Sequence, residues 1–198
     1  MSATEASARA HTLGLDGVIF SEHSRHWIPQ EKNAFGAREY STEYGHIIVI
    51  GDLPKTSNPS AVDLREHLNT HDGIMILAHP FRYIRSGGNL LYCEVVTHSD
   101  VAILADHPVF KIVDEIEVLN GGCTQHENDL AREVARHVGM RGMAGSDAHS
   151  TGEIGHCATA FEDSVQSLDG LIDAIRRRRF TAVQRSHSGR FVSQGSER

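Results

Sequence analysis

Short, uninterrupted apolar runs are the clearest pattern along this chain. Residues 47–50 and 74–78 contain no polar side chain, which is typical of strands that are covered on both faces of a sheet. Residues 113–119 alternate in part between apolar and polar side chains, as strands do. Strands are predicted over residues 17–20, 47–50, 74–78, 113–119, 142–145 and 180–183.

Apolar residues at helical spacing lie between these runs. Leu168, Leu171, Ile172 and Ile175 recur at i, i+3, i+4 and i+7 after Ser167, a residue type that caps helices. Helices are predicted over residues 3–13, from residue 60, over residues 124–138 and from residue 167. The alternation of strand and helix predicts βαβ units and a mostly parallel α/β sheet or barrel.

Length and composition fit one folded domain. The chain has 198 residues, of which 39% are hydrophobic, so a core can form. We predict a domain over residues 1–185 and a flexible C-terminal tail over residues 186–198, which are polar and rich in Gly and Ser. The apolar runs are far too short to span a bilayer, so no membrane partner is expected.

Charge and cysteine content narrow the classes of protein. The net charge of −7 argues against a protein that mainly binds nucleic acid, because phosphate backbones attract Lys and Arg. Cys93, Cys123 and Cys157 are widely spaced and include no C-x-x-C pair, which argues against a disulfide framework. No basic and apolar leader follows Met1. Together these features favour a cytoplasmic protein.

Histidine is unusually frequent, with 14 residues, and imidazole is the commonest metal ligand in proteins. Parallel α/β folds collect their functional residues at the C-terminal ends of strands. In this chain, histidines or carboxylates follow four apolar runs, and a further histidine begins a strand. These residues are His23, Glu39, His46, His79, Asp147 and His149. Their joint placement predicts a shared metal site.

The residue types indicate which chemistry such a site supports. Carboxylates such as Glu39 and Asp147 can bridge ions, and imidazoles favour Zn, Mn or Fe over Mg and Ca. Divalent ions neutralise an anionic phosphoester and activate water for attack on phosphorus. Arg82 is a candidate clamp for a phosphate oxygen, with a surface ion pair as the alternative interpretation. His149 or His23 could protonate the leaving oxygen.

Five segments, taken together and in this order, resemble the PHP superfamily, which is named after polymerase and histidinol phosphatase. They are residues 14–23, 39–46, 77–80, 116–121 and 145–149. The similarity extends over nearly the whole chain. It implies a distorted (β/α)7 barrel that holds up to three divalent ions. It also implies hydrolysis of phosphoesters by a metal-bound hydroxide, with a small phosphorylated metabolite or nucleotide as the expected substrate.

The resemblance also assigns ligands to separate ions. Glu39 resembles the carboxylate that bridges two ions. His46 and His79 resemble the two histidines that complete the ion next to Glu39. Asp147 resembles the aspartate that serves a remaining ion.

One feature of the family is missing from this sequence. The family's first strand carries an H-x-H pair, and no H-x-H occurs here. The ion that the resemblance assigns to His23 and His149 therefore lacks a third ligand. Only the set Glu39, His46 and His79 is complete. The domain is accordingly expected to be incomplete at the first strand, either as a truncated product, which we favour, or as a degenerate relative.

Several alternatives follow from this gap. The chain could be a catalytically impaired metal-binding domain of the same type. An unpaired sheet edge at the missing strand could bind a partner chain. A polymerase-associated or nuclease module is disfavoured by the acidic charge. A metal-dependent amidohydrolase would share the barrel but would be expected to show an H-x-H pair and a ligand lysine, and neither was found.

Overall fold

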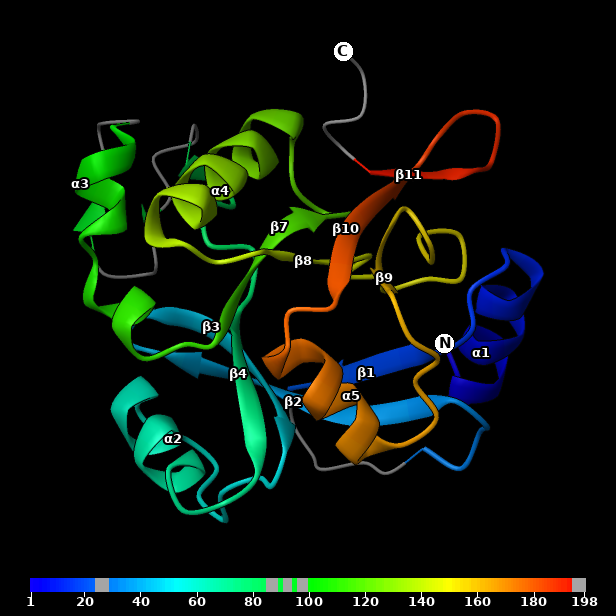
Figure 1. The fold of residues 1–198 in the computed structure, drawn as a ribbon, viewed down its shortest axis with the longest axis horizontal. Helices are drawn as coiled ribbons and strands as arrows, with labels where there is room; N and C mark the ends of the chain where they lie inside the picture. The colour runs from blue at the N-terminus through cyan, green and yellow to red at the C-terminus, as the bar shows by residue number, and fades with distance from the viewer. Residues whose placement is uncertain (24–28, 85–88, 91–93, 96–99, 194–198) are drawn as a thin grey trace.

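The computed structural model describes residues 1–23, 29–84, 89–90, 94–95 and 100–193. Within these residues, a six-stranded sheet with the order β1-β2-β3-β4-β7-β8 forms the centre of the fold (Figure 1). Its strands are β1 Val18–Glu22, β2 Ala34–Thr42, β3 Gly45–Gly51, β4 Gly73–Leu77, β7 Glu115–Asn120 and β8 Met143–Gly145. The sheet contains five of the six predicted strands and adds β2, which the sequence analysis did not predict.

The pairing of the strands is mixed rather than mostly parallel. β1 with β2, β4 with β7, and β7 with β8 are parallel, whereas β3 is antiparallel to both β2 and β4. Only two residues separate Thr42 from Gly45, and so short a connection can join only antiparallel strands. The sheet curls into a half-barrel, and the described residues do not close a (β/α)7 barrel. β1 lies at one edge of this sheet, and binding of a partner there stays a prediction.

Five α-helices within the described residues pack around the sheet, and their caps follow the sequence. They are α1 Ala3–Thr12, α2 Ala61–Leu68, α3 Val101–Ala105, α4 Gln125–Val138 and α5 Leu168–Arg176. Ser60 and Thr124 form capping boxes at the starts of α2 and α4. Gly139 ends α4 in the left-handed conformation, with φ 75°, which glycine adopts without steric cost.

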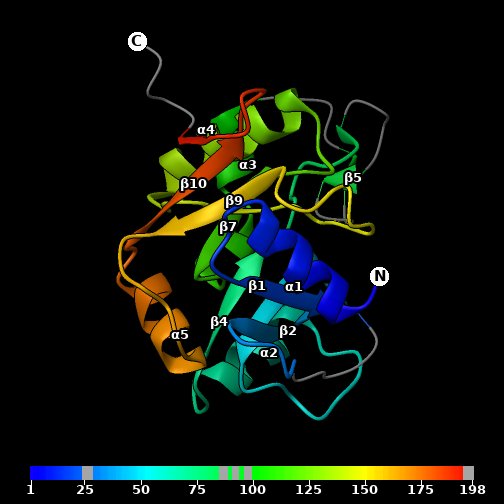
Figure 2. The ribbon, with the colours of Figure 1, turned by 90° about the vertical axis from the view of Figure 1, so that its right-hand side faces the viewer.

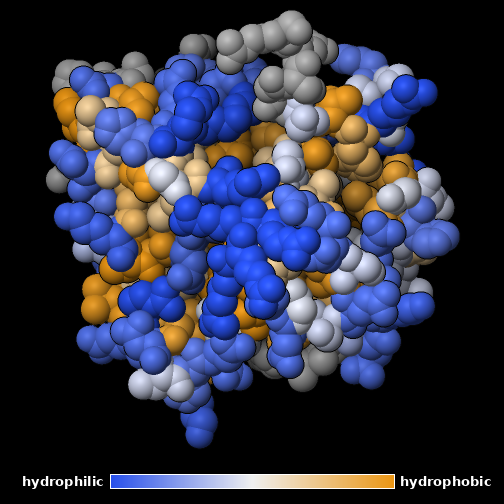
Figure 3. All heavy atoms as spheres, in the orientation of Figure 1, coloured by the Kyte–Doolittle hydropathy of each residue, from blue (hydrophilic) through white to orange (hydrophobic). Residues whose placement is uncertain are grey.

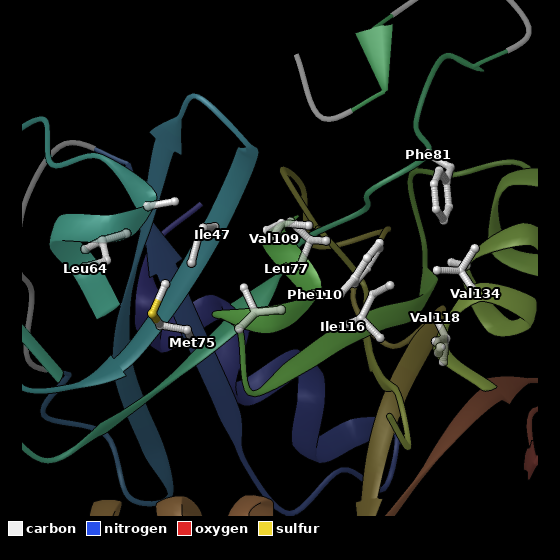
Figure 4. Packing of buried hydrophobic residues seen from close by; sticks show 14 of the residues in the cluster. Ile47, Leu64, Met75, Leu77, Phe81, Val109, Phe110, Ile116, Val118 and Val134 are labelled. Carbon is white, nitrogen blue, oxygen red and sulfur yellow. The ribbon is translucent and has the colours of Figure 1, made fainter. Parts of the chain in front are cut away.

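The apolar run of β4 is explained by burial on both faces. Met75 and Leu77 pack in a cluster that includes side chains of α2, α3 and α4 (Figure 4). Ile74 and Ile76 point to the opposite face and pack against α5. Figure 2 shows α5 and α2 separated by β4. The face of the molecule that carries α5 is mostly hydrophilic, with smaller apolar areas (Figure 3).

A second, three-stranded antiparallel sheet follows α4 and β8. It consists of β9 Cys157–Phe161, β10 Phe180–Arg185 and β11 Phe191–Ser193. We expected residues 186–198 to be a flexible tail, but residues 191–193 pair with residues 183–185 of β10. The polar segment before them is the turn of a hairpin, in which Gly189 has φ 82°.

Three short elements complete the described chain. β5 Asn89–Leu90 pairs with β6 Glu94–Val95, and a 3₁₀ helix covers Pro108–Lys111. Cys93 lies outside the described residues.

Candidate metal centre

The antiparallel pairing of β2 and β3 places Glu39 and His46 on one face of the sheet. Ser41 lies opposite His46 in the register, and Glu39 is two residues before Ser41. Residues two apart on a strand point to the same face, so Glu39 and His46 are diagonal neighbours. Their side chains meet, with 2.5 Å between Glu39 Oε1 and His46 Nδ1. The expectation that Glu39 follows a strand was therefore wrong, since Glu39 lies within β2.

His79 joins this pair from the neighbouring strand. It follows β4, and the backbone N–H of Ala78 donates to the carbonyl of His46, at 2.9 Å. The His79 Nε2 atom lies 3.4 Å from Glu39 Oε1 and 3.4 Å from His46 Nδ1. The residue has φ 28°, a strained backbone conformation for a residue with a side chain, and such strain concentrates at functional sites.

Burial and hydrogen bonding oppose one another in the electrostatics of this trio. Burial would raise the pKa of Glu39, but hydrogen bonds from His46 and His79 outweigh it and hold that pKa far below its ordinary value. Burial would lower the pKa of His79, but its hydrogen bond to Glu39 and the charge of Glu117 raise it overall. When no metal is bound, the two histidines thus stabilise the charged carboxylate of Glu39, and Glu39 and Glu117 favour the protonated form of His79.

The donor set fits a divalent transition metal. Glu39, His46 and His79 bring three ligand atoms within 4.8 Å of one another. Two ligands of a tetrahedral zinc ion lie roughly 3.3 Å apart, close to the two separations of 3.4 Å that involve His79. The shorter contact between His46 and Glu39 is a hydrogen bond that an ion would replace. Two imidazoles and one carboxylate suit Zn, Mn or Fe.

The other predicted ligands do not join this trio. His23 Nε2 lies 3.9 Å from Glu39 Oε1, and its side chain is 56% exposed. His149 is 80% exposed, and its Nδ1 lies 3.0 Å from the backbone carbonyl of Asp147. Asp147 follows β8 and forms an ion pair with Arg82. The predicted ligand roles of these three residues therefore stay predictions.

Arg82 lies in the site, next to the trio. The turn after β4 carries both His79 and Arg82. The Arg82 backbone N–H donates to the His79 carbonyl at 3.1 Å. Its Nη2 donates to Asp147 Oδ2 and, at 2.7 Å, to Asn120 Oδ1. The pair with Asp147 is four-fifths buried, so it is not the surface ion pair that we had considered as the alternative.

Glu117 and Asn120 are site residues that the sequence analysis did not propose. Glu117 Oε2 accepts from the backbone N–H of His79 at 3.0 Å and from Asn120 Nδ2 at 2.9 Å. Burial raises the pKa of Glu117, and the charge of Asp147 adds to that effect. Two acidic residues within the predicted strand over residues 113–119, Glu115 and Glu117, were the available signal, because buried carboxylates require specific partners.

The comparisons with known proteins agree with this architecture. The family model described as PHP-associated matches residues 125–180. The fold is similar to that of PsfC from Pseudomonas syringae PB-5123, with a TM-score of 0.67 and 16% identity over 94% of this chain and 83% of that chain. None of the curated proteins compared with the chain matches it.

A second solved structure shares the fold more distantly. It is a predicted metal-dependent phosphoesterase from Bifidobacterium adolescentis, with a TM-score of 0.51 and 11% identity over 93% of this chain and 92% of that chain.

In the part of the chain that the structure describes, none of the helices combines the length and apolarity that a bilayer crossing needs. The chain is thus similar to PHP-associated proteins over residues 125–180, and its fold is similar to that of a solved metal-dependent phosphoesterase.

Proposed function

We propose that the protein is a metal-dependent phosphoesterase that hydrolyses a small phosphorylated metabolite or nucleotide. The observation that carries this proposal is the convergence of Glu39, His46 and His79 from three adjacent strands, with the Arg82 guanidinium on the same turn as His79. A divalent ion and a guanidinium side by side suit an anionic phosphoester. The solved phosphoesterase that shares the fold supports the same class of reaction.

Each residue has a distinct role in this proposal. Glu39, His46 and His79 hold the ion, for which we propose Zn, Mn or Fe. When bound, the ion supplies Lewis-acid polarisation of the phosphoryl group and lowers the pKa of a water. Arg82 binds a phosphate oxygen and orients the ester. His23 and His149 are exposed at the edge of the centre, and either can donate a proton to the leaving oxygen.

The competing hypothesis is a metal-binding domain without activity. It is favoured by one observation, since Asp147 is paired with Arg82 and not with the trio. A site that binds its ion but releases no phosphate would support this alternative. A metal-dependent amidohydrolase is the other competing hypothesis. It would hydrolyse cyclic amides or lactones, whereas a phosphoesterase would hydrolyse phosphate esters.

The test is a hydrolysis assay of the full chain, stripped of metal and then loaded with Zn²⁺, Mn²⁺ or Fe²⁺. Substrates are p-nitrophenyl phosphate, nucleoside monophosphates, sugar phosphates and a panel of cyclic amides and lactones. We expect phosphate release that needs the ion, and a loss of at least about 100-fold in H46A and H79A. H137A is the matched control, because His137 is exposed on α4, and it should keep full activity.

Two results would contradict the proposal. Hydrolysis of amides or lactones without phosphate release would indicate an amidohydrolase. Stable binding of an ion with no turnover of any phosphate ester would indicate the impaired domain.

A further inference from the structure

A second cationic group lies beside the metal trio. The ends of β4, β7 and β8 converge on the Arg82 guanidinium, which donates from Nη2 to Asn120 at the end of β7 and to Asp147 after β8. Carboxylates in that position can serve either an ion or a guanidinium. The surrounding residues decide between the two.

The loop after β7 is shaped for a guanidinium. Asn120 Oδ1 also accepts from the backbone N–H of Gly122 at 2.8 Å, so the amide oxygen is aimed at Arg82. A Cβ atom at Gly122 would lie 2.5 Å from Arg82 Nη2, and glycine therefore leaves the space that Nη2 fills. Asn128 fixes Asn120 in turn, with hydrogen bonds of 2.9 and 3.2 Å to its backbone N–H and carbonyl.

The charge of the guanidinium is permanent and locally balanced. Burial would lower the pKa of Arg82, but the hydrogen bond and charge of Asp147 raise it overall. The neighbouring Cys123 thiol adds no charge near neutral pH, because burial raises its pKa to about 11. A second divalent ion at Asp147 would have to displace this paired, fixed cation and would be repelled by it.

The described residues offer one complete set of protein ligands. Among them, only Glu39, His46 and His79 bring three His, Cys, Asp or Glu ligand atoms within 4.8 Å. Glu117 stands between the two groups, since its Oε2 accepts from His79 N and from Asn120 Nδ2. The ion site and the guanidinium site are thus neighbours with separate ligand sets.

We propose that Arg82 is the second cation of this centre. The chain binds one divalent ion, at Glu39, His46 and His79, and the guanidinium holds the position beside Asp147 that a further ion would need. This inference rests on the proposed function only in assigning an ion to the trio. The buried Arg82 Nε has no hydrogen-bond partner among the described residues, so the contacts of Nη2 do not use all the donors of the guanidinium.

The test measures the number of bound ions and not activity. The full chain is stripped of metal and titrated with Zn²⁺ or Mn²⁺ by isothermal calorimetry, with elemental analysis of the loaded protein. We expect one ion per chain for the wild type and for D147N, with a Kd that differs by less than about tenfold. H46A should lose the ion, and H137A should match the wild type.

Specific results would overturn the inference. Two or three ions per wild-type chain, or loss of an ion in D147N, would show that Asp147 is a metal ligand. If circular dichroism shows that D147N does not fold, the number of ions bound per wild-type chain alone decides. Absence of phosphatase activity in a chain with one bound ion would contradict the proposed function and leave this inference intact.

Discussion

The buried carboxylate of Glu117 accepts a hydrogen bond from the backbone N–H of His79, with 3.0 Å between Oε2 and N. The same oxygen accepts from Asn120 Nδ2 at 2.9 Å. One side chain of β7 thus connects the turn that carries His79 and Arg82 to the loop that orients the guanidinium. Because His79 has a strained backbone with φ 28°, this connection stabilises a conformation that the chain would otherwise avoid.

Removal of the Glu117 carboxylate should destabilise both the fold and the site. E117A leaves two buried donors, His79 N–H and Asn120 Nδ2, without their acceptor, at a cost of about 1–3 kcal/mol each. We expect a loss of stability in urea unfolding and weaker metal binding. E117Q retains one oxygen acceptor in the same shape and should lose less. Equal loss in both variants would show that the negative charge, and not hydrogen bonding, matters.

The metal-free protein should depend on pH through the trio. The pKa of His79 is raised above 6.5 in the folded chain by Glu39 and Glu117, despite the opposing effect of burial. A group whose pKa is raised on folding stabilises the fold fully when the pH is below its pKa in the unfolded chain. This stabilisation is lost as the pH rises through its pKa in the folded chain. The pKa of Glu39 is lowered on folding, so Glu39 stabilises the fold above pH 4.5. This stabilisation is lost as the pH falls through the pKa of Glu39 in the folded chain.

We therefore expect the metal-free chain to melt at a higher temperature at pH 6 than at pH 8. Scanning calorimetry of protein treated with a chelator checks this directly. E39Q weakens the hydrogen bond that contributes most to raising the His79 pKa, so the difference in melting temperature between pH 6 and pH 8 should be smaller in this variant. An unchanged difference in E39Q would assign the effect to other groups.

A methyl group at residue 122 should displace the guanidinium. In G122A the new Cβ would lie 2.5 Å from Arg82 Nη2, so Arg82 must shift away from Asn120 and Asp147. We expect a rise in KM for a phosphate ester of about tenfold, which corresponds to about 1.4 kcal/mol.

G152A is the matched control for that variant. The nearest atom to its new Cβ is Ser150 Oγ at 3.9 Å, so KM should not change. A similar rise in KM in both variants would show that the effect does not come from Arg82.

Burial should decide the cost of truncating leucines on α5. Leu171 is 1% exposed and packs against the sheet, whereas Leu168 on the same helix is 37% exposed. L171A should lower the free energy of unfolding by about 2–5 kcal/mol, and L168A by much less, as measured by denaturant unfolding. Equal losses would contradict the packing of α5 against Ile74 and Ile76.

Local features of the fold followed from the sequence because they depend on neighbouring residues. The Thr124 and Glu127 capping box, with hydrogen bonds of 2.8 and 3.3 Å, begins α4 as predicted. Residues 74–77 of the apolar run lie in the strand β4, where alternate side chains are buried on opposite faces. The histidine content and the order of the motifs predicted a metal site.

Only the tertiary structure decided which of the predicted ligands meet. Glu39 contacts His46 because β2 and β3 are antiparallel and in a particular register, and register depends on pairing between whole strands. Arg82 and Asp147 are 65 residues apart in the sequence, and their ion pair exists because β4, β7 and β8 end at the same place. Sequence determines which groups are available, whereas long-range packing determines their partners.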